Sequence, residues 1–408
     1  MRDRYDMTVQ RRRRGPAMAD AQTGLPADPA TSLAMRLLAD DLTGALDTAA
    51  ELVPLAGPIA TFWPEAIPAR LPAIAAWDSG TREMTPAAAV AALHPHLPAL
   101  ADAALAFKKI DSLLRGPTLA EIAACLRRGL WATAILAPAF PFQGRITRDG
   151  IQYRRTPEHG WAPLGAPLVP QLRALGVAAT RGDPGTPPAR GLHVFDAETD
   201  ADLRAVVAAG RRAPGPVLWI GTGGLAQALA AAWNGASARP AAPAMPPRGL
   251  PGPILGLFGS DQSVTQAQLT ACGPHWLALP PSAGAADQVA ARLASTGRAL
   301  VSLDLSPGLD RAEAARLIAA ELGDLARALP RPGTLLVAGG ETLRALCRVL
   351  GATSLSVQGR LVPGLPWSVL QGGPWNGVTV ISKSGAFGPP TLLRDLLASP
   401  HLLLERTG

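Results

Sequence analysis

The chain has 408 residues, of which 48% are hydrophobic, enough for two or three globular domains with substantial cores. This composition excludes a disordered or fibrous protein. The formal net charge is +7, but six arginines and two aspartates in the first 14 residues supply four of these charges, so the rest of the chain is only mildly basic.

Residues 1–32 are rich in arginine and precede the first strand pattern. Their composition predicts a disordered leader; a nucleic-acid or membrane-surface arm and a transit peptide are the alternatives, and Met18 and Met35 are also plausible start sites. The three cysteines are too far apart for a zinc ribbon or a disulfide framework, which favours a reducing cytoplasm. No apolar run is long enough for a membrane span.

The first predicted elements are a buried strand over Met35–Leu38, a polar turn and a helix from Ala45. Three carboxylates gather at the carboxyl end of this strand, where open α/β sheets bind ligands: Asp40, Asp41 and Asp47. One acid at a helix start needs no explanation beyond capping. Three neighbouring carboxylates repel one another unless a cation or hydroxyl donors lie between them. The stretch therefore predicts a polyol or metal-phosphate site, with helix capping as the alternative.

Strands and helices then alternate. The predicted strands are Ile59–Phe62, Ile74–Trp77, Ala104–Lys108, Ala134–Ala137 and Val217–Ile220, and the predicted helices are Pro86–Leu93, Thr118–Gly129 and Thr199–Gly210. Between Thr156 and Gly191 the composition predicts long loops with one short helix over Val169–Leu175.

Polar side chains follow two of these strands. The cluster after Ile74–Trp77 contains Arg82 and is the weaker signal. The cluster after Ala104–Lys108 is the stronger signal, because it places Lys109, Asp111, Ser112 and Arg115 within seven residues. Two cations and an acid at a strand end suit a small anion, such as a carboxylate or a phosphoryl group. The alternative is a surface turn with an internal ion pair. The segment around Gly144-Arg145 and Asp149-Gly150 by itself indicates a hairpin.

The Pro-, Ala- and Gly-rich stretch 234–253 predicts an interdomain linker between a domain over 33–233 and one over 254–408. Beyond it the alternation restarts, with strands over Ile254–Phe258, Leu300–Leu303, Thr334–Ala338 and Val378–Ser382. We therefore expect two α/β domains with parallel or mixed sheets and a cleft between them.

Three strand-to-helix turns in the second domain contain glycine. Gly339-Gly340 precedes a helix that opens at Glu341-Thr342, Gly259-Ser260 precedes a helix from Val264 or Thr265, and Lys383–Gly388 follows the last strand. Glycines let a ligand approach the backbone, and helix N-termini favour phosphate. None of these turns is a P-loop or a dinucleotide fingerprint. Each alone is a tight connection, but together they favour a nucleotide site.

Eight blocks in order resemble the four-carbon acid sugar kinases, over Leu37 to about Leu393. They are ADDLTGALD, KKIDSLLRG, PAFPFQGR, DAETDADL, GTGGLAQALA, GGETLRALCRVLG, PGLPWSVLQGG and KSGAFG. The resemblance implies an N-terminal domain that binds the sugar acid, a C-terminal nucleotide-binding domain and phosphoryl transfer from ATP in the cleft, for which Mg²⁺ is expected. The implied partners are small molecules, with neither nucleic acid nor membrane, and a homodimer is a possible assembly.

By similarity, ATP contacts fall on Ser260, Gly339, Gly340, Glu341, Thr342 and Gly385, and the sugar-acid side draws on Asp40, Asp41, Asp47, Arg82, Lys109, Asp111 and Arg115, next to Ser112. We expect Asp41 or Asp111 to orient the acceptor hydroxyl. Lys109 and Arg115 are expected to hold the carboxylate of the acceptor or the migrating phosphoryl group.

The sequence departs from the family at three places. Asp261-Gln262 interrupts a Ser-Cys-Ser turn, Leu113 replaces a Thr, and Thr156–Trp161 replaces an acidic segment. The alternatives are therefore a catalytically inactive sugar-acid and nucleotide sensor, and a kinase for another short polyol acid. A third alternative is a nucleic-acid-associated protein that binds through the arginine-rich residues 1–32. A Rossmann-type dehydrogenase is disfavoured because no GxGxxG follows a strand.

Overall fold

The computed structural model describes residues 34–156, 158, 160–234, 249–281, 285–305 and 309–398. The predicted leader and positions 235–248 of the predicted linker lie outside the described residues, so both remain predictions. We call the described residues before position 235 the N-terminal half and those after position 248 the C-terminal half.

Strands and helices alternate through both halves. The N-terminal half contains β1 (Met35–Ala39), α1 (Leu42–Ala56), β2 (Ile59–Phe62), β3 (Ile74–Asp78), α2 (Pro86–Leu93), α3 (Leu97–Ala101), β4 (Leu105–Lys109), α4 (Thr118–Arg127), β5 (Thr133–Ala137), β6 (Arg145–Arg148), β7 (Ile151–Thr156), β8 (Gly160–Pro163), α5 (Leu168–Ala174), β9 (Ala179–Arg181), β10 (Gly191–Val194), α6 (Asp200–Gly210), β11 (Val217–Gly221) and α7 (Gly223–Asn234). The C-terminal half contains β12 (Ile254–Phe258), α8 (Ser263–Thr270), β13 (Trp276–Leu279), α9 (Ala285–Thr296), β14 (Arg298–Leu303), α10 (Arg311–Ala328), β15 (Thr334–Ala338), α11 (Gly340–Val349), β16 (Ser354–Val362), β17 (Leu365–Gln371), β18 (Thr379–Lys383) and α12 (Leu392–Ala398).

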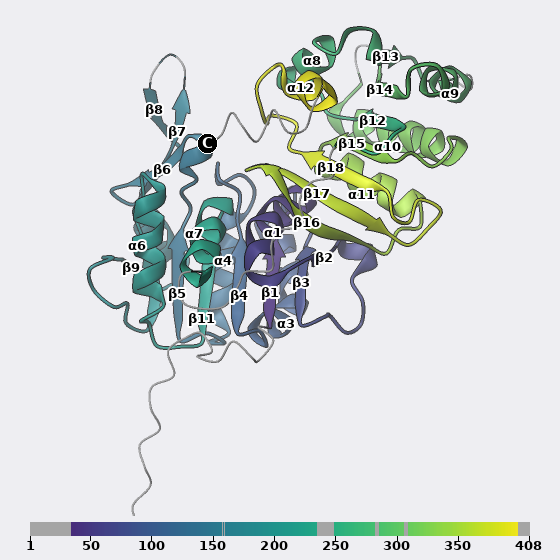
Figure 1. Cartoon of the computed structure of the whole chain (residues 1–408). Coiled ribbons are helices and arrows are strands. Elements are labelled where there is room, and N and C mark those ends of the chain that lie inside the picture. The colour runs from purple at the N-terminus through teal and green to yellow at the C-terminus, as the bar shows by residue number, and fades with distance from the viewer. Residues whose placement is uncertain are drawn as a thin grey trace, which may run out of the picture.

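One 15-stranded mixed sheet runs through both halves in the order β13-β14-β12-β15-β18-β17-β16-β2-β3-β1-β4-β11-β5-β10-β9. The strands of each half are parallel, except for the hairpin β16–β17, which is antiparallel to its neighbours. β16 pairs with β2 and so joins the two halves (Figure 1). The prediction of an α/β fold with parallel or mixed sheets is therefore confirmed.

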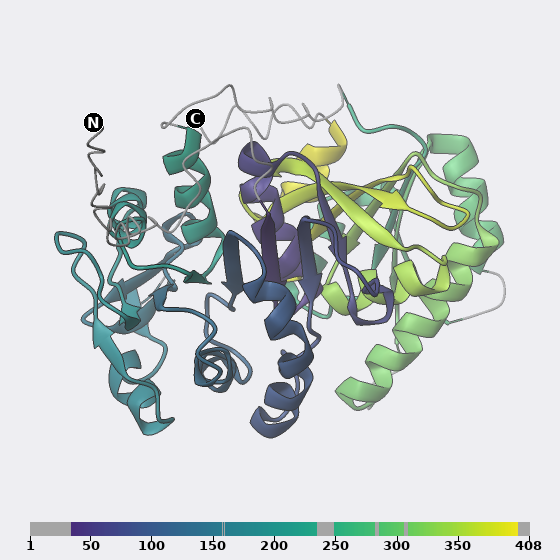
Figure 2. The same ribbon diagram turned by 90° about the horizontal axis from the view of Figure 1, so that it is seen from below.

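Helices cover both faces of the sheet in the N-terminal half, which is why its strands are nearly continuous apolar runs. Leu37 and Leu38 are adjacent in β1, yet they belong to separate hydrophobic clusters on opposite faces. The cluster of Leu37 contains side chains of α1, α6 and α7, and the cluster of Leu38 contains side chains of α2, α4 and α5. Figure 2 shows these two helical layers on either side of the strands.

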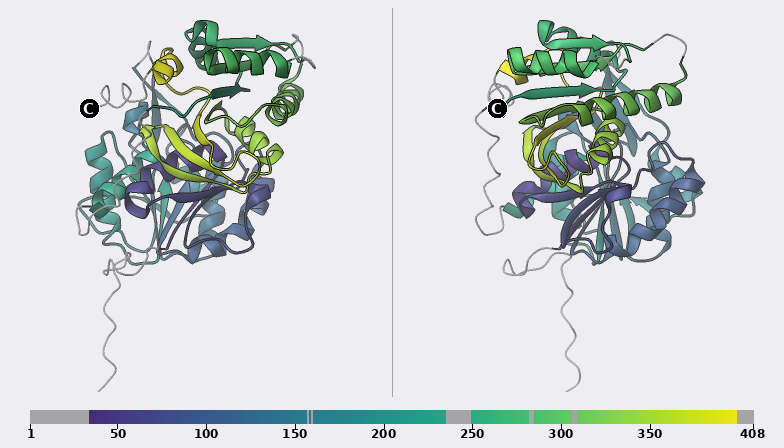
Figure 3. Two further views of the ribbon diagram at one scale, coloured as in Figure 1. Left: turned by 45° about the vertical axis from the view of Figure 1, so that its right-hand side comes forward. Right: turned by 90° about the vertical axis from the view of Figure 1, so that its right-hand side faces the viewer.

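The core continues into the C-terminal half. Leu46 of α1 belongs to the same hydrophobic cluster as Leu322 of α10, Leu343 of α11 and Leu355 of β16. Figure 3 shows the yellow-green hairpin lying between the purple-to-teal N-terminal half and the green C-terminal half. The two halves are therefore held together by shared apolar packing as well as by strand pairing.

Several predicted bounds differ from the structure by one or two residues, and two differences are larger. α1 begins at Leu42 instead of Ala45, because the Asp41 side chain accepts a hydrogen bond from Gly44 N and caps the helix. The segment predicted as loops between Thr156 and Gly191 contains the short strands β8 and β9 beside the predicted helix. β6, β7 and β8 form a separate antiparallel sheet, which includes the predicted hairpin.

The sequence prediction missed the hairpin β16–β17. Its sequence signal was the alternation of the apolar residues Leu355, Val357 and Leu361 with the polar residues Ser356, Gln358 and Arg360. The turn that follows contains Gly364, whose φ is +87°. This hairpin supplies both the strand that reaches β2 and a wall of the cavity described below.

Candidate active site

The acidic stretch after β1 is held in place by helix capping. Asp41 is the N-cap of α1: its Oδ1 accepts from Gly44 N at 3.0 Å, and its Oδ2 accepts from Thr43 Oγ1 at 2.7 Å. A Cβ at Gly44 would lie 2.5 Å from Lys109 Nζ, so glycine at this position leaves space for the lysine. The capping alternative is therefore correct for Asp41, although the carboxylate also faces cations.

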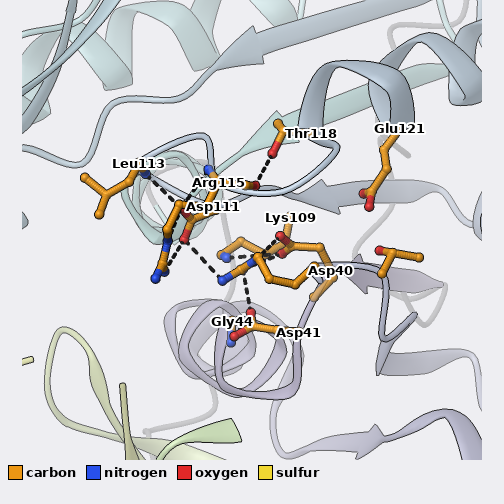
Figure 4. A network of polar contacts seen from close by, with 12 residues as sticks. Asp40, Asp41, Gly44, Lys109, Asp111, Leu113, Arg115, Thr118 and Glu121 are labelled. Atoms are coloured by element: carbon orange, nitrogen blue, oxygen red, sulfur yellow. Dashed lines mark hydrogen bonds and ion pairs between the residues drawn. The ribbon is translucent and has the colours of Figure 1, made fainter. Parts of the chain in front are cut away.

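Arg82 connects the three acidic positions closest to the sheet. Its Nη2 donates to Asp40 Oδ1 at 2.8 Å and to Asp41 Oδ1 at 2.7 Å, and its Nη1 lies 3.3 Å from Asp111 Oδ1. Figure 4 shows these three aspartates beside Lys109. Lys109 Nζ lies 3.8 Å from Asp40 Oδ1. Burial alone would raise the pKa of Asp40, but Lys109 and Arg82 outweigh it and hold that pKa below its usual value.

Asp111 is surrounded by donors. It accepts 2.8 Å hydrogen bonds from both Nε and Nη2 of Arg115, and its Oδ2 also accepts from the backbone N–H groups of Leu113 and Arg115. Burial would raise its pKa, but the hydrogen bonds from Arg115 and the charge of Arg82 lower it instead. Asp111 therefore stays ionised throughout the neutral range, and Arg115 is largely committed to it.

Asp47 lies in the second turn of α1, beyond the first turn predicted for it. It is half-buried, and its Oδ1 has no hydrogen-bond partner among the described residues. Burial raises its pKa to about 6, against the lowering effect of Lys109, Arg360 and the N–H of Gly364. Asp47 is thus the least compensated carboxylate of the predicted cluster.

A cavity of about 320 Å³ opens where these residues meet the C-terminal half. The predicted residues that line it are Asp41, Asp47, Arg82, Lys109, Asp111, Ser112 and Arg115, and Asp40 lies behind them. The C-terminal half contributes, among others, Gly364, Pro366, Lys383 and Ser384. The structure therefore brings together predicted residues from three stretches of the N-terminal half, and residues from 140–145 and 222–223 also line the cavity.

Two cations in this cavity were missing from the predicted site. Lys383, at the end of β18, is 2% exposed and forms no ion pair within the described part of the chain. Its Nζ donates to Thr265 Oγ1, Ser384 O and Gly385 O at 2.9–3.2 Å, and burial lowers its pKa to about 8. Arg145 of β6 also lines the cavity; burial lowers its pKa, and its Nε lacks a partner among the described residues. The sequence signal for both was a cation at a strand end near a glycine: Arg145 directly follows Gly144, and Lys383 lies two residues before Gly385.

The predicted nucleotide residues lie next to this cavity. A Cβ at Gly385 would collide with Ser260 Oγ, and one at Gly340 would lie 3.2 Å from Thr43 Oγ1, so the start of α11 approaches the start of α1. Glu341 and Thr342 line a second cavity of about 220 Å³ between α10 and α11, with Gly259 and Arg344 among the other lining residues. Gly339 precedes α11 with φ of +102°, which glycine adopts without strain.

No group of three His, Cys, Asp or Glu side chains that could hold a metal ion occurs within the described ranges. Asp40, Asp41 and Asp111 are each already paired with arginine. The donor set therefore does not fit a preformed protein cage for Mg²⁺, and we assign no protein ligand to that ion. Among the helices that the structure describes, none has the length and apolar composition needed to cross a membrane.

Two family models match the chain: a sugar-binding N-terminal domain over residues 35–187 and a nucleotide-binding C-terminal domain over residues 255–393. D-threonate kinases from Cupriavidus necator and Bordetella bronchiseptica are 35% and 30% identical to it, and each alignment covers 88% of this chain and 95% of the relative. A 3-oxo-tetronate kinase from Pseudomonas fluorescens is 29% identical over 68% of this chain and 74% of its own length.

Solved structures share the fold. A structure from Salmonella typhimurium matches with a TM-score of 0.70 at 20% identity, covering 88% of this chain and 97% of its own. Protein HI1011 from Haemophilus influenzae matches with a TM-score of 0.64 at 18% identity, covering 89% and 99%. At these identities the likeness concerns the arrangement of elements alone.

Proposed function

The chain belongs to the four-carbon acid sugar kinase family, and from that premise we propose that it uses ATP to phosphorylate a hydroxyl of threonate, erythronate or an oxo-tetronate. D-threonate is the first candidate, because two relatives that align over 95% of their length are D-threonate kinases. The observation that carries the proposal is the cavity in which Lys109 and Asp111 face Lys383.

Phosphoryl transfer depends mainly on positioning and on neutralising charge, and this cavity offers both. We assign Asp41, Lys109, Asp111 and Arg115 to orienting the acceptor and neutralising the migrating group, with Asp40, Asp47, Arg82 and Ser112 on the substrate side. We expect Asp40 and Arg82 to position the other residues of the site, because Arg82 contacts Asp40, Asp41 and Asp111 and so fixes the orientation of their carboxylates.

Arg145 is our candidate for the carboxylate of the sugar acid. It lines the cavity without an acidic partner among the described residues, whereas Arg115 already binds Asp111 through two nitrogens. A guanidinium with free donors matches a carboxylate in geometry and charge.

For the nucleotide we propose a path from the second cavity, past the start of α11, to the first cavity. Thr342 lines the second cavity, Gly340 approaches Thr43, and Thr43 lines the first cavity, so these residues mark a continuous route. Ser260, Gly339, Gly340, Glu341, Thr342 and Gly385 lie along it or beside it. Mg²⁺ is expected to arrive with the phosphates and to add charge neutralisation there.

The test is ADP release with Mg²⁺ against a panel of D- and L-threonate, the erythronates, oxo-tetronates and longer aldonates. Turnover of one four-carbon acid, lost in Lys109→Ala but kept in the surface variant Arg327→Ala, is the expected result. Among the described residues, Arg327 pairs with Asp324 alone, at the surface, so this variant controls for the loss of a cation in general.

Two alternatives give different results. A catalytically inactive sensor would bind ATP and a sugar acid without releasing ADP. A kinase for another polyol acid would bind ATP but release ADP only with an acceptor outside the four-carbon set. Turnover by the Lys109→Ala variant at the wild-type rate would contradict the proposed site.

A further inference from the structure

Asp47 differs from the other carboxylates of the cavity in what its oxygens contact. Asp40 and Asp111 each accept from both Nε and Nη2 of one arginine, and Asp41 accepts from Arg82, Thr43 and Gly44. In contrast, no side chain of the described residues donates to Asp47, and its Oδ1 has no partner at all among them. The N–H of Gly364 is the backbone donor that lowers its pKa.

Asp47 lines the cavity at the place where side chains of the two halves meet. It projects from α1 into the cavity that Lys109 lines from β4 and Lys383 lines from β18. Gly223 at the start of α7 lies beside it, since a Cβ there would be 3.7 Å from Asp47 Oδ2. Gly364 also lines this part of the cavity, and the rings of Phe140 and Phe387 pack against Gly223 and Gly364, so aromatic carbons flank the cavity around Asp47.

On this geometry, and resting on the proposed kinase function, we infer that Asp47 is the general base that takes the proton from the hydroxyl being phosphorylated. The hydroxyl oxygen forms its bond to the γ-phosphorus of ATP while the bond from that phosphorus to the β,γ-bridging oxygen breaks. The electron pair of the broken bond leaves with ADP, and the hydroxyl proton moves to Asp47 and then to water. Asp41 and Asp111 keep the orienting role, because their lone pairs are already used.

The electrostatics around Asp47 suit this role. Burial has the largest effect on the pKa of Asp47 and raises it to about 6. The charges of Lys109 from β4 and Arg360 from β16 lower this pKa, and Asp41 from its own helix raises it. Glu51 lies one turn away on the same helix, and the interaction between the two acids raises the pKa of Glu51. A base of this strength is ionised at neutral pH and can still accept a proton.

The decisive variant is Asp47→Asn, which keeps size and polarity but cannot accept the proton. We expect kcat to fall by roughly 10²- to 10⁴-fold, the usual range for loss of a general base, with the KM values of ATP and sugar acid changed far less. The wild-type kcat should rise with pH through about 6 as Asp47 ionises, and this limb should be absent from the residual activity of the variant.

The matched control is Glu51→Gln. Glu51 lies one turn further along α1 and also has a raised pKa, but it does not line the cavity, so kcat and the pH limb should be retained. Folding of each variant is checked by circular dichroism and by binding of ADP.

Three results would overturn the inference. If Asp47→Asn keeps at least a third of the wild-type kcat, or if its kcat still rises with pH through about 6, another group is the base. If its loss of activity is restored by excess Mg²⁺, Asp47 binds the metal ion instead. Failure of the wild-type protein to turn over any acid in the panel would overturn the kinase function and this role with it, whereas the first two results leave the kinase function intact.

Discussion

Arg360 of β16 donates to the carboxylate of Glu51 in α1, so an ion pair joins the C-terminal hairpin to the N-terminal half. The Glu51 side chain is 2% exposed and that of Arg360 is 30% exposed. Burial raises the pKa of Glu51 to about 7 even with the arginine beside it, and Oε1 remains without a partner among the described residues. The stability of this junction should therefore depend on pH.

The Arg360→Met variant should be destabilised by about 3 kcal/mol at pH 8, because removing one partner leaves a buried charge uncompensated. The loss should be smaller at pH 5, where Glu51 is protonated. Urea unfolding at both pH values measures this. The double variant Arg360→Met with Glu51→Gln should recover most of the stability. If the double variant is as unstable as the single variant, packing of the arginine stem is responsible instead.

The free energy of unfolding should decrease as pH rises from about 4.5 to 7. Over this range the folded state holds a proton on Glu51 that the unfolded state has already released, so rising pH favours unfolding. A shift from 4.5 to about 7 corresponds to about 3 kcal/mol at 1.4 kcal/mol per unit. Glu51→Gln should make the decrease shallower, whereas Glu65→Gln, at an exposed position, should leave it unchanged. Equal slopes in all three proteins would contradict the assignment.

Arg145→Ala should raise the KM for the sugar acid by roughly 10- to 100-fold, the usual effect of losing a charge-assisted hydrogen bond, and leave the KM for ATP nearly unchanged. Arg148→Ala is the matched control, because Arg148 lies on the same strand but pairs with Glu198 at the surface. Steady-state kinetics with each substrate varied in turn separate the two effects. A larger change for ATP than for the acid would assign Arg145 to the phosphates instead.

Lys383→Met should weaken ADP and ATP binding, because it removes a buried cation and three hydrogen bonds that hold the turn after β18. In the wild-type protein, nucleotide affinity should decrease as pH rises through about 8, where Lys383 loses its proton, and the variant should lack this dependence. Isothermal titration calorimetry at pH 7 and pH 9 measures both effects. Retained pH dependence in the variant would show that another group causes it.

Much of the fold could be predicted because buried strands leave strong local patterns. The strands Ile59–Phe62, Ile254–Phe258 and Thr334–Ala338 agree with β2, β12 and β15 residue for residue. The hairpin β16–β17 was missed because one of its pairing partners, β2, is distant in sequence. Only the folded chain shows that the hairpin joins the strands of the two halves into one sheet.

The site could be predicted only in part, for a related reason. Asp41, Lys109 and Asp111 were found because several polar residues cluster within each stretch. Arg145 and Lys383 each lie in a turn that resembles many others, and their chemical character comes from burial without an acidic partner, which the tertiary structure creates. Asp111 is surrounded by several hydrogen-bond and charge partners, whereas Asp47 is not. The contact of Asp111 with Arg82 joins two separate segments, so the sequence alone does not reveal this difference.

The pairing of β16 with β2 also bears on how the polypeptide could be divided. The chain passes between the halves through positions 235–248, but β16 returns to the N-terminal sheet and packs against α1. A protein expressed as two separate fragments, cut within that stretch, should therefore reassemble from its pieces without a covalent connection.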